Sequence, residues 1–150
     1  MDIVSKKKRS ELMSDIKSYN TKPEIMVRKV LYNMGFRYRI NDSVEGIKPD
    51  IILRKYNVVI FVHGCYWHRH RGCLLAYNPK SKVDFWNQKF KKNIERDKKV
   101  FLKLKLQGWR VGVIWECTTR NSDEFARTML ELQQWILNGS DEFESTFVKI

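Results

Sequence analysis

The feature that most constrains the fold is a cluster of metal-binding side chains directly after an apolar run. All three histidines and two of the three cysteines lie within residues 63–73, immediately after the apolar residues 58–62. The third cysteine, Cys117, directly follows a second apolar segment, residues 109–115. Three cysteines cannot all pair within one chain, which favours metal binding or free thiols over a disulfide framework. If the two apolar segments are neighbouring strands, their ends bring Cys117 to the cluster.

These side chains predict a structural metal site. Three thiolates and one imidazole make the Cys₃His tetrahedron that is typical of structural zinc. The spacing is compatible with Cys65, His70, Cys73 and Cys117, but His68 fits the nitrogen position equally well. The competing interpretation is a set of buried free thiols with histidines at the surface.

The distribution of charge predicts a polyanionic partner. The chain carries 29 basic and 17 acidic residues, a net charge of +12. Residues 1–40 hold 10 bases and 4 acids, residues 80–110 hold 11 and 3, and residues 111–150 hold 3 and 7. A basic surface gains affinity for nucleic acid by releasing counterions from phosphates, so nucleic acid is the expected partner. The alternative is a solvated basic face that only keeps the protein soluble.

Periodicity and turn residues predict a small sheet flanked by helices. Thr21 and Glu24 form a capping box before a helix that ends at Gly35. The remaining pattern indicates a strand over 36–40, a hairpin of strands 50–53 and 58–62, a long amphipathic helix over 86–104, an interior strand over 109–115, and a last helix between Asn121 and Gly139. The order α-β-β-β-α-β-α is typical of a mixed α/β or α+β layer architecture.

Location follows from what the sequence lacks. The longest apolar run has five residues, against the roughly 20 of a membrane-spanning helix. The basic residues 6–9 are not followed by an apolar stretch of the kind found in secretory signals. We therefore expect a protein of the reducing cytoplasm with no membrane partner.

Carboxylates and histidines gather at one end of the predicted hairpin. Asp50 begins its first strand, His63 follows its second strand, and Glu24 can approach from the first helix. Paired carboxylates hold hard cations such as Mg²⁺, and histidines near basic residues contact phosphate or move protons. For Asp50 the competing interpretation is a common Pro-Asp strand start, and for Glu24 a purely capping role.

Two large aromatic side chains, Tyr66 and Trp67, lie between the expected metal ligands. Apolar side chains that enter a duplex unstack a base step, so these rings are candidates for such a wedge. They are equally compatible with packing on the metal cluster.

Several strings of this sequence resemble one family. These strings are Pro49-Asp50, Phe61-Val62-His63-Gly64-Cys65-Tyr66-Trp67-His68, Asn93-Ile94-Glu95-Arg96-Asp97 and Gly108-Trp109-Arg110-Val111, together with Trp115-Glu116-Cys117. The chain closely resembles the very short patch repair endonucleases over residues 7–136. These bacterial enzymes nick DNA beside the thymine of a T:G mismatch, which arises when 5-methylcytosine deaminates.

The resemblance implies a fold and a domain organisation. The family has a core like that of type II restriction endonucleases, which implies an α/β (mixed α+β) domain with a small mixed central sheet flanked by helices and a structural zinc site. Residues 21–150 are then a single endonuclease domain, and residues 1–20 are a basic arm that contacts DNA.

The resemblance also implies a catalytic site. Asp50 and the main-chain carbonyl of Val62 bind Mg²⁺, at a position where the family usually has Thr in place of Val62. His68 helps to activate the attacking water, His63 contacts the scissile phosphate, and Glu24 supports the metal through water. Hydrolysis nicks the strand 5′ to the mismatched thymine and leaves 5′-phosphate and 3′-hydroxyl ends.

Zinc and DNA ligands follow from the same resemblance. The zinc ligands are Cys65, His70, Cys73 and Cys117, with Gly72 as an apparent insertion before the third. The DNA-contacting residues are Met13 and Ile16 of the arm, Tyr66 and Trp67 of the wedge, and Lys89 and Asn93 of the long helix. The implied partner is double-stranded DNA with a T:G mismatch, with a functional link to a cytosine-5 DNA methyltransferase and to mismatch-repair proteins. We expect a monomer, because a nicking enzyme does not need two symmetric active sites.

Two alternatives remain at this point. A restriction-type endonuclease would share the core, but Phe61-Val62-His63 stands where that class normally carries Glu-x-Lys. A catalytically silent zinc-containing DNA-binding module would need only the arm, the metal site and the wedge. Against that module stands the joint presence of Asp50, His63 and His68.

Overall fold

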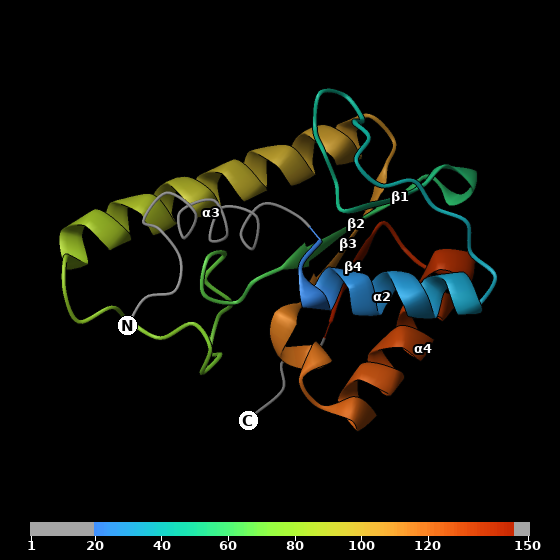
Figure 1. Cartoon of the computed structure of the whole chain (residues 1–150). Helices are drawn as coiled ribbons and strands as arrows, with labels where there is room; N and C mark the ends of the chain where they lie inside the picture. The colour runs from blue at the N-terminus through green and yellow to red at the C-terminus, as the bar shows by residue number, and fades with distance from the viewer. Residues whose placement is uncertain (1–19, 146–150) are drawn as a thin grey trace, which may run out of the picture.

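The fold is a four-stranded sheet with helices on both faces (Figure 1). It is seen in a computed structural model, which describes residues 20–145. The elements are α2 (Lys22–Asn33), β1 (Ile51–Leu53), the 3₁₀ turn η1 (Arg54–Tyr56), β2 (Val58–His63), α3 (Val83–Leu106), β3 (Arg110–Trp115), the 3₁₀ turn η2 (Glu116–Thr119), α4 (Ser122–Asn138) and β4 (Glu142–Glu144). The predicted mixed α/β class is confirmed.

The strand pairing positions the two segments that carry the metal-binding side chains. β1 and β2 form the predicted antiparallel hairpin, with Ile51 opposite Ile60. β2 and β3 are parallel, and His63 lies opposite Trp115 at their carboxyl ends. The residues that follow His63 and the residues that follow Trp115 therefore leave the sheet side by side, at the carboxyl ends of these strands.

Alternation along the strands divides the core into two layers. Ile60 and Val62 face the layer that contains Val27 and Leu31 of α2 and several side chains of α4. Phe61 faces the opposite layer, together with Leu104 of α3. Successive side chains of a strand point to opposite faces, and a core layer covers each face of β2. β2 is therefore buried along its whole length.

The predicted helix starts are confirmed by their caps. The Thr21 hydroxyl accepts a hydrogen bond from the Glu24 amide at 3.4 Å, and the Asn121 side chain accepts one from the Glu124 amide at 3.0 Å. Side-chain acceptors at these positions satisfy helix amides that have no partner within the helix.

The sheet differs from the prediction at two places. The expected strand over 36–40 is reduced to one bridge between Arg39 and Ile52. The chain turns away directly afterwards, at Asn41, whose φ of 56° is left-handed. At the other edge, β4 pairs with β3 in parallel and was not predicted. Its three residues, Glu-Phe-Glu, are too few for a periodic signal.

The described part of the chain contains no helix that is long and apolar enough to cross a membrane.

Candidate active site and metal-binding cluster

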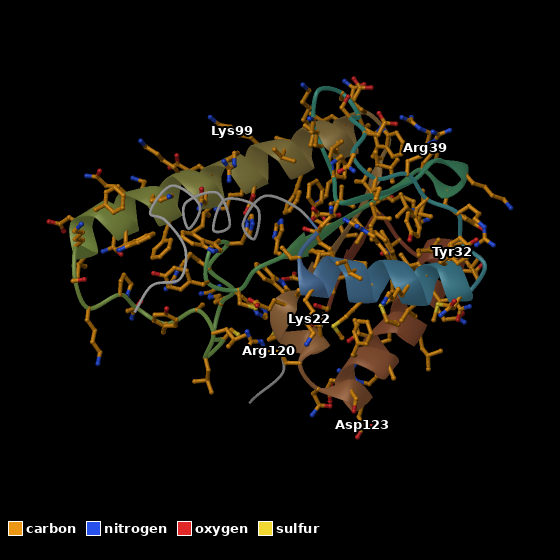
Figure 2. The ribbon with its side chains drawn as sticks, in the orientation of Figure 1. Lys22, Tyr32, Arg39, Lys99, Arg120 and Asp123 are labelled. Carbon is orange, nitrogen blue, oxygen red and sulfur yellow. The ribbon has the colours of Figure 1, made fainter. Side chains whose placement is uncertain are left out.

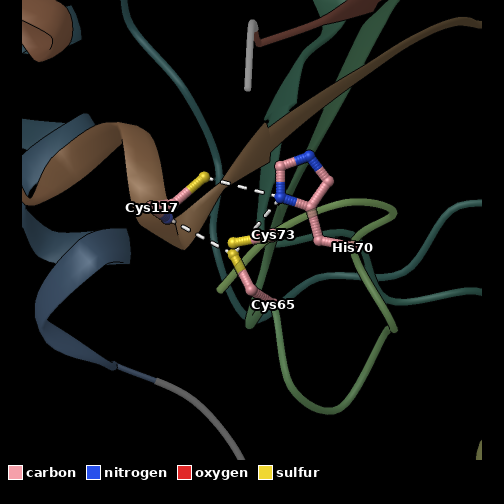
Figure 3. A group of neighbouring side chains, drawn as sticks. All are labelled: Cys65, His70, Cys73 and Cys117. Carbon is pink, nitrogen blue, oxygen red and sulfur yellow. Dashed lines mark hydrogen bonds between the residues drawn. The ribbon is translucent and has the colours of Figure 1, made fainter. Parts of the chain in front are cut away.

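Three cysteines and one histidine meet where β2 and β3 end (Figure 3). The Nδ1 atom of His70 lies 3.6 Å from Sγ of Cys65 and 3.4 Å from Sγ of Cys117. One ligand atom from each of Cys65, His70, Cys73 and Cys117 lies within 4.8 Å of the others, and all four residues are buried. These residues form a site that can hold a metal ion. The structure thus brings His70 rather than His68 to the sulfurs.

The loop that carries three of these ligands folds back on itself through main-chain hydrogen bonds. The His70 amide donates to the Cys65 carbonyl at 3.0 Å, and the Cys73 amide donates to the His70 carbonyl at 3.2 Å. Gly72 has a left-handed φ of 73°, which costs glycine little. The apparent insertion is therefore accommodated in the turn, and Cys73 still reaches the cluster.

The cluster disfavours the charged form of the Cys65 thiol when no cation is present. A hydrogen bond with the Cys117 side chain, and then burial, raise the pKa of Cys65 well above its usual range. Bound divalent metals reverse this effect, because they deprotonate the thiols that coordinate them.

Asp50 lies just before β1, and its carboxylate reaches the neighbouring strand. Its Oδ2 atom accepts a hydrogen bond from the Val62 amide at 2.7 Å. Burial, and next the negative charge of Glu24, raise the pKa of Asp50 from 3.8 to about 7. The two carboxylates thus lie close together on the hydrophobic core, as the sequence predicted. Close carboxylates that repel one another favour a bound cation.

Glu24 has a capping contact and an electrostatic contact at the same time. Its Oε2 atom accepts hydrogen bonds from the Asn20 amide and from Nη2 of Arg28, each at 2.9 Å. Its side chain is 6% exposed and that of Arg28 is 12% exposed, so little solvent screens this pair. Glu24 is therefore more than a helix cap, and its support of a metal ion stays a prediction.

His63 and His68 form a stacked pair beside the end of β2. Their ring centroids are 3.7 Å apart and the rings are 4° from parallel. Nδ1 of His68 lies 2.7 Å from Oδ2 of Asp97 on α3. Burial, and next the electrostatic interaction with His68, lower the pKa of His63 to about 3, so His63 is neutral. The pair lines a cavity of about 400 Å³ between α3 and the sheet, together with Phe101 and Trp115.

Tyr66 and Trp67 belong to a larger set of rings that we call the aromatic cluster: Tyr66, Trp67, Tyr77, Trp86 and Phe90. Tyr66 lies 4.8 Å from Tyr77 and 5.3 Å from Phe90, and Trp67 lies 5.6 Å from Trp86, all between ring centroids. The metal-binding cysteines instead pack with Val113 and Trp115. The rings therefore pack on the start of α3 rather than on the metal cluster.

The two residues predicted on the long helix lie against these rings. The Asn93 side chain donates a hydrogen bond to the Trp67 carbonyl at 3.2 Å. Nζ of Lys89 lies 5.4 Å from the centre of the Trp67 ring and 5.6 Å from that of Trp86. Both side chains thus contact the aromatic cluster.

Many of the lysines of the described residues lie on α3. Figure 2 shows Lys99 on the outer side of this helix, whereas Lys22 and Arg120 lie on the side of α4, near Asp123. α3 also carries the exposed side chains of Lys91, Lys92 and Lys98. Trp86 and Phe90 of the aromatic cluster also belong to α3, so this helix carries both rings and positive charge. Met13 and Ile16 lie outside the described residues.

Sequence reasoning missed Asp97 and the additional rings. Asp97 is 29 positions from its partner His68. The sequence signal that could have identified Asp97 is its position four residues after Asn93, which places both residues on one face of α3.

Comparisons with known proteins point to one family of DNA endonucleases. The family profile described as DNA mismatch endonuclease Vsr matches residues 1–74. The type II nicking enzyme V.NmeAIP of Neisseria meningitidis is 49% identical over 120 residues, which are 80% of this chain and 85% of that protein. The DNA mismatch endonuclease Vsr of Escherichia coli is 35% identical over 137 residues, 90% of this chain and 87% of that protein.

A solved structure shares the fold. The catalytic domain of the homing endonuclease I-Bth0305I superposes with a TM-score of 0.52 at 23% identity. The match covers 81% of this chain and 100% of that chain. The sequence matches, which cover most of the chain, establish that it belongs to the Vsr family of DNA mismatch endonucleases.

Proposed function

We propose that this endonuclease nicks one DNA strand 5′ to the thymine of a T:G mismatch by Mg²⁺-dependent hydrolysis. The observation that carries the proposal is the hydrogen bond that the Asp50 carboxylate accepts from the Val62 amide, one residue before His63 of the stacked pair. A carboxylate and a main-chain carbonyl can hold a metal ion, and imidazoles can move a proton or donate to a phosphate in metal-assisted hydrolysis.

The oxygen-rich half of the site suits Mg²⁺. Asp50 and the main-chain carbonyl of Val62 would hold the ion, and Glu24 would support it through water. Mg²⁺ prefers such oxygen ligands, and its charge would offset the burial and the repulsion by Glu24 that raise the pKa of Asp50. When bound, it would stabilise the charge that develops on the phosphate oxygens.

The histidines have separate tasks in this proposal. Nδ1 of His68 is held by Asp97, so Nε2 is the atom that accepts a proton from the attacking water. The water oxygen then bonds to phosphorus as the bond from phosphorus to the 3′-oxygen breaks. His63, which is neutral, keeps one N–H to donate to a phosphate oxygen. The departing 3′-oxygen takes a proton from solvent, so the products are a 3′-hydroxyl and a 5′-phosphate.

We assign the Cys₃His cluster to structural zinc. Zinc at about 2.3 Å from sulfur and about 2.0 Å from nitrogen places these ligand atoms roughly 3.5 Å apart in a tetrahedron. The distances of 3.6 and 3.4 Å from His70 to Cys65 and Cys117 agree with that edge. Four buried protein ligands would complete the coordination of a zinc ion, which would leave it no position for substrate.

The aromatic cluster supplies the preference for a mismatch. Tyr66 and Trp67 would enter the duplex next to the T:G pair, which is easier to distort than a matched pair. Lys89 and Asn93 would face the DNA from α3. The arm of residues 1–20, with Met13 and Ile16, would approach from the opposite groove, while residues 21–150 form the catalytic domain.

The proposal extends to the cellular setting. A T:G mismatch from 5-methylcytosine implies a functional link to a cytosine-5 DNA methyltransferase and to mismatch-repair proteins. The enzyme would act as a monomer in the cytoplasm, on the nucleoid.

The test is nicking of end-labelled duplexes that contain one T:G mismatch in a pool of flanking sequences. We expect a single nick 5′ to the thymine that requires Mg²⁺ and is lost in Asp50→Asn. Asp42→Asn is a matched control. Asp42 is an exposed carboxylate in a loop outside the site, and it accepts a hydrogen bond from the Ser43 amide at 2.8 Å, as Asp50 does from the Val62 amide.

Three results would contradict the proposal. Binding without strand loss in every context would indicate a silent binding module. Cleavage of matched duplexes would indicate a restriction-type enzyme. Equal loss of activity in the two variants would remove Asp50 from the metal site.

A further inference from the structure

We propose that Arg69 is a positioning residue that holds the aromatic cluster ready to enter the duplex before DNA is bound. This inference rests on the proposed wedge function of Tyr66 and Trp67. Arg69 lies between His68 and His70 in sequence, and its side chain donates hydrogen bonds to main-chain carbonyls of the loop and to the side chain of Asn78.

The guanidinium of Arg69 joins two separate stretches of the loop. Nη1 donates to the carbonyl of Tyr66 at 3.3 Å and to that of Tyr77 at 3.1 Å. Nη2 donates to the carbonyl of Ala76 at 3.0 Å and to Oδ1 of Asn78 at 3.2 Å. One planar group thus fixes the distance between the main chain at Tyr66 and the main chain at residues 76–78.

The same group packs on the rings. The guanidinium carbon lies 4.1 Å above the centre of the Phe90 ring on α3 and 5.5 Å from that of Tyr66. Cations over aromatic rings are stabilised by the ring quadrupole, more so when partly removed from water, and Arg69 is half-buried. Arg69 therefore attaches the loop to the helix from which Trp86 and Lys89 project.

Lysine cannot replace this arrangement. Its single nitrogen has no planar fork, so it cannot span acceptors on both stretches and stack at the same time. Arg69 also has a left-handed φ of 54°, which is uncommon for a residue other than glycine. The loop is thus built around this side chain.

Holding the rings ready has a measurable consequence. The apparent dissociation constant equals the intrinsic constant divided by the fraction of molecules in the competent conformation. If loss of the bridge leaves about one-tenth of the molecules competent, affinity for mismatched DNA falls about tenfold. Matched DNA, which the rings do not enter, is unaffected, and so is the rate of the saturated complex.

The experiment compares Arg69→Lys with Arg71→Lys. The two substitutions keep the net charge, and Arg71 is an exposed residue of the same loop. For each protein we would measure the dissociation constants for T:G and T:A duplexes with pooled flanking sequences, the single-turnover nicking rate at saturating protein, and the zinc content. Fluorescence of 2-aminopurine beside the mismatch reports entry of the rings.

We expect Arg69→Lys to weaken binding of T:G duplexes about tenfold and of T:A duplexes less than twofold. The saturated rate and the zinc content stay within twofold of the wild-type values, and Arg71→Lys changes none of these quantities. An unchanged T:G to T:A ratio in Arg69→Lys overturns the inference. Equal weakening on both duplexes overturns it in favour of a phosphate contact, and loss of zinc overturns it in favour of a role in the metal loop.

A separate variant distinguishes failure of the inference from failure of the wedge. If Trp67→Ala retains the preference for T:G duplexes, the wedge itself is wrong. If Trp67→Ala loses the preference and Arg69→Lys keeps it, only the role of Arg69 is wrong.

Discussion

The metal cluster ties together parts of the chain that are far apart, and this makes a quantitative prediction. Cys65 and Cys117 are 52 positions apart, whereas Cys65 and Cys73 are eight positions apart. In Cys73→Ala the remaining ligands still connect the loop to the end of β3. In Cys117→Ala the remaining ligands all lie within residues 65–73, so the long-range connection is lost.

The difference follows from chain entropy. By the relation used for covalent cross-links, closing a loop of about 52 residues stabilises by about 4 kcal/mol, and closing one of about eight residues by about 2.5 kcal/mol. Each variant loses one sulfur ligand, so that cost is common to both. We therefore expect metal to stabilise Cys117→Ala less than Cys73→Ala, by about 1.5 kcal/mol.

The assay is urea unfolding of each protein under reducing conditions, once with excess Zn²⁺ and once with a chelator. The difference between the two free energies of unfolding is the metal-linked stabilisation. Packing changes caused by the substitution occur in both conditions and cancel in this difference.

Either of two results would refute the reasoning. Equal metal-linked stabilisation in the two variants would mean that the long-range connection contributes nothing. A wild-type protein whose stability does not respond to the chelator would mean that the cluster does not hold a structural ion.

Three further predictions concern the catalytic site. Val62→Thr keeps the nicking rate within about threefold, because the main-chain carbonyl is the proposed ligand; it lowers the free energy of unfolding by about 1–2 kcal/mol, because a hydroxyl enters the buried core. A tenfold gain in rate would show that the hydroxyl assists. Asp97→Asn lowers the single-turnover rate by about 10²–10⁴-fold at unchanged DNA affinity, because His68 loses the carboxylate that orients it; an unchanged rate would remove this role. Glu24→Gln raises the Mg²⁺ concentration for half-maximal rate about tenfold, because one negative charge beside Asp50 is gone; an unchanged Mg²⁺ titration would place Glu24 outside the metal site.

Local signals in the sequence were sufficient for the helices and the hairpin. The caps at Thr21 and Asn121 act within three residues, and the strands of the hairpin are adjacent in the chain. Such features depend on neighbouring residues, so the pattern of the sequence contains them. The three cysteine ligands of the metal site were also predictable, since cysteines are rare and were clustered with the histidines.

Non-local contacts account for what the sequence did not reveal. Spacing alone leaves His68 and His70 equivalent, because the choice depends on how the loop folds back on Cys65. β4 exists only because the chain returns beside β3 after α4. The bond between His68 and Asp97 likewise depends on where α3 lies over the sheet.

The central claim is that Asp50, His68 and the aromatic cluster act together on one strand at a T:G mismatch. The most direct measurement is single-turnover cleavage of duplexes labelled on both strands, with T:G compared with T:A and C:G at the same position in pooled flanking sequences. The account predicts a nick only in the thymine strand of the T:G duplex, immediately 5′ to that thymine, with Mg²⁺ required. Cleavage of both strands, or equal rates on matched and mismatched duplexes, would contradict it.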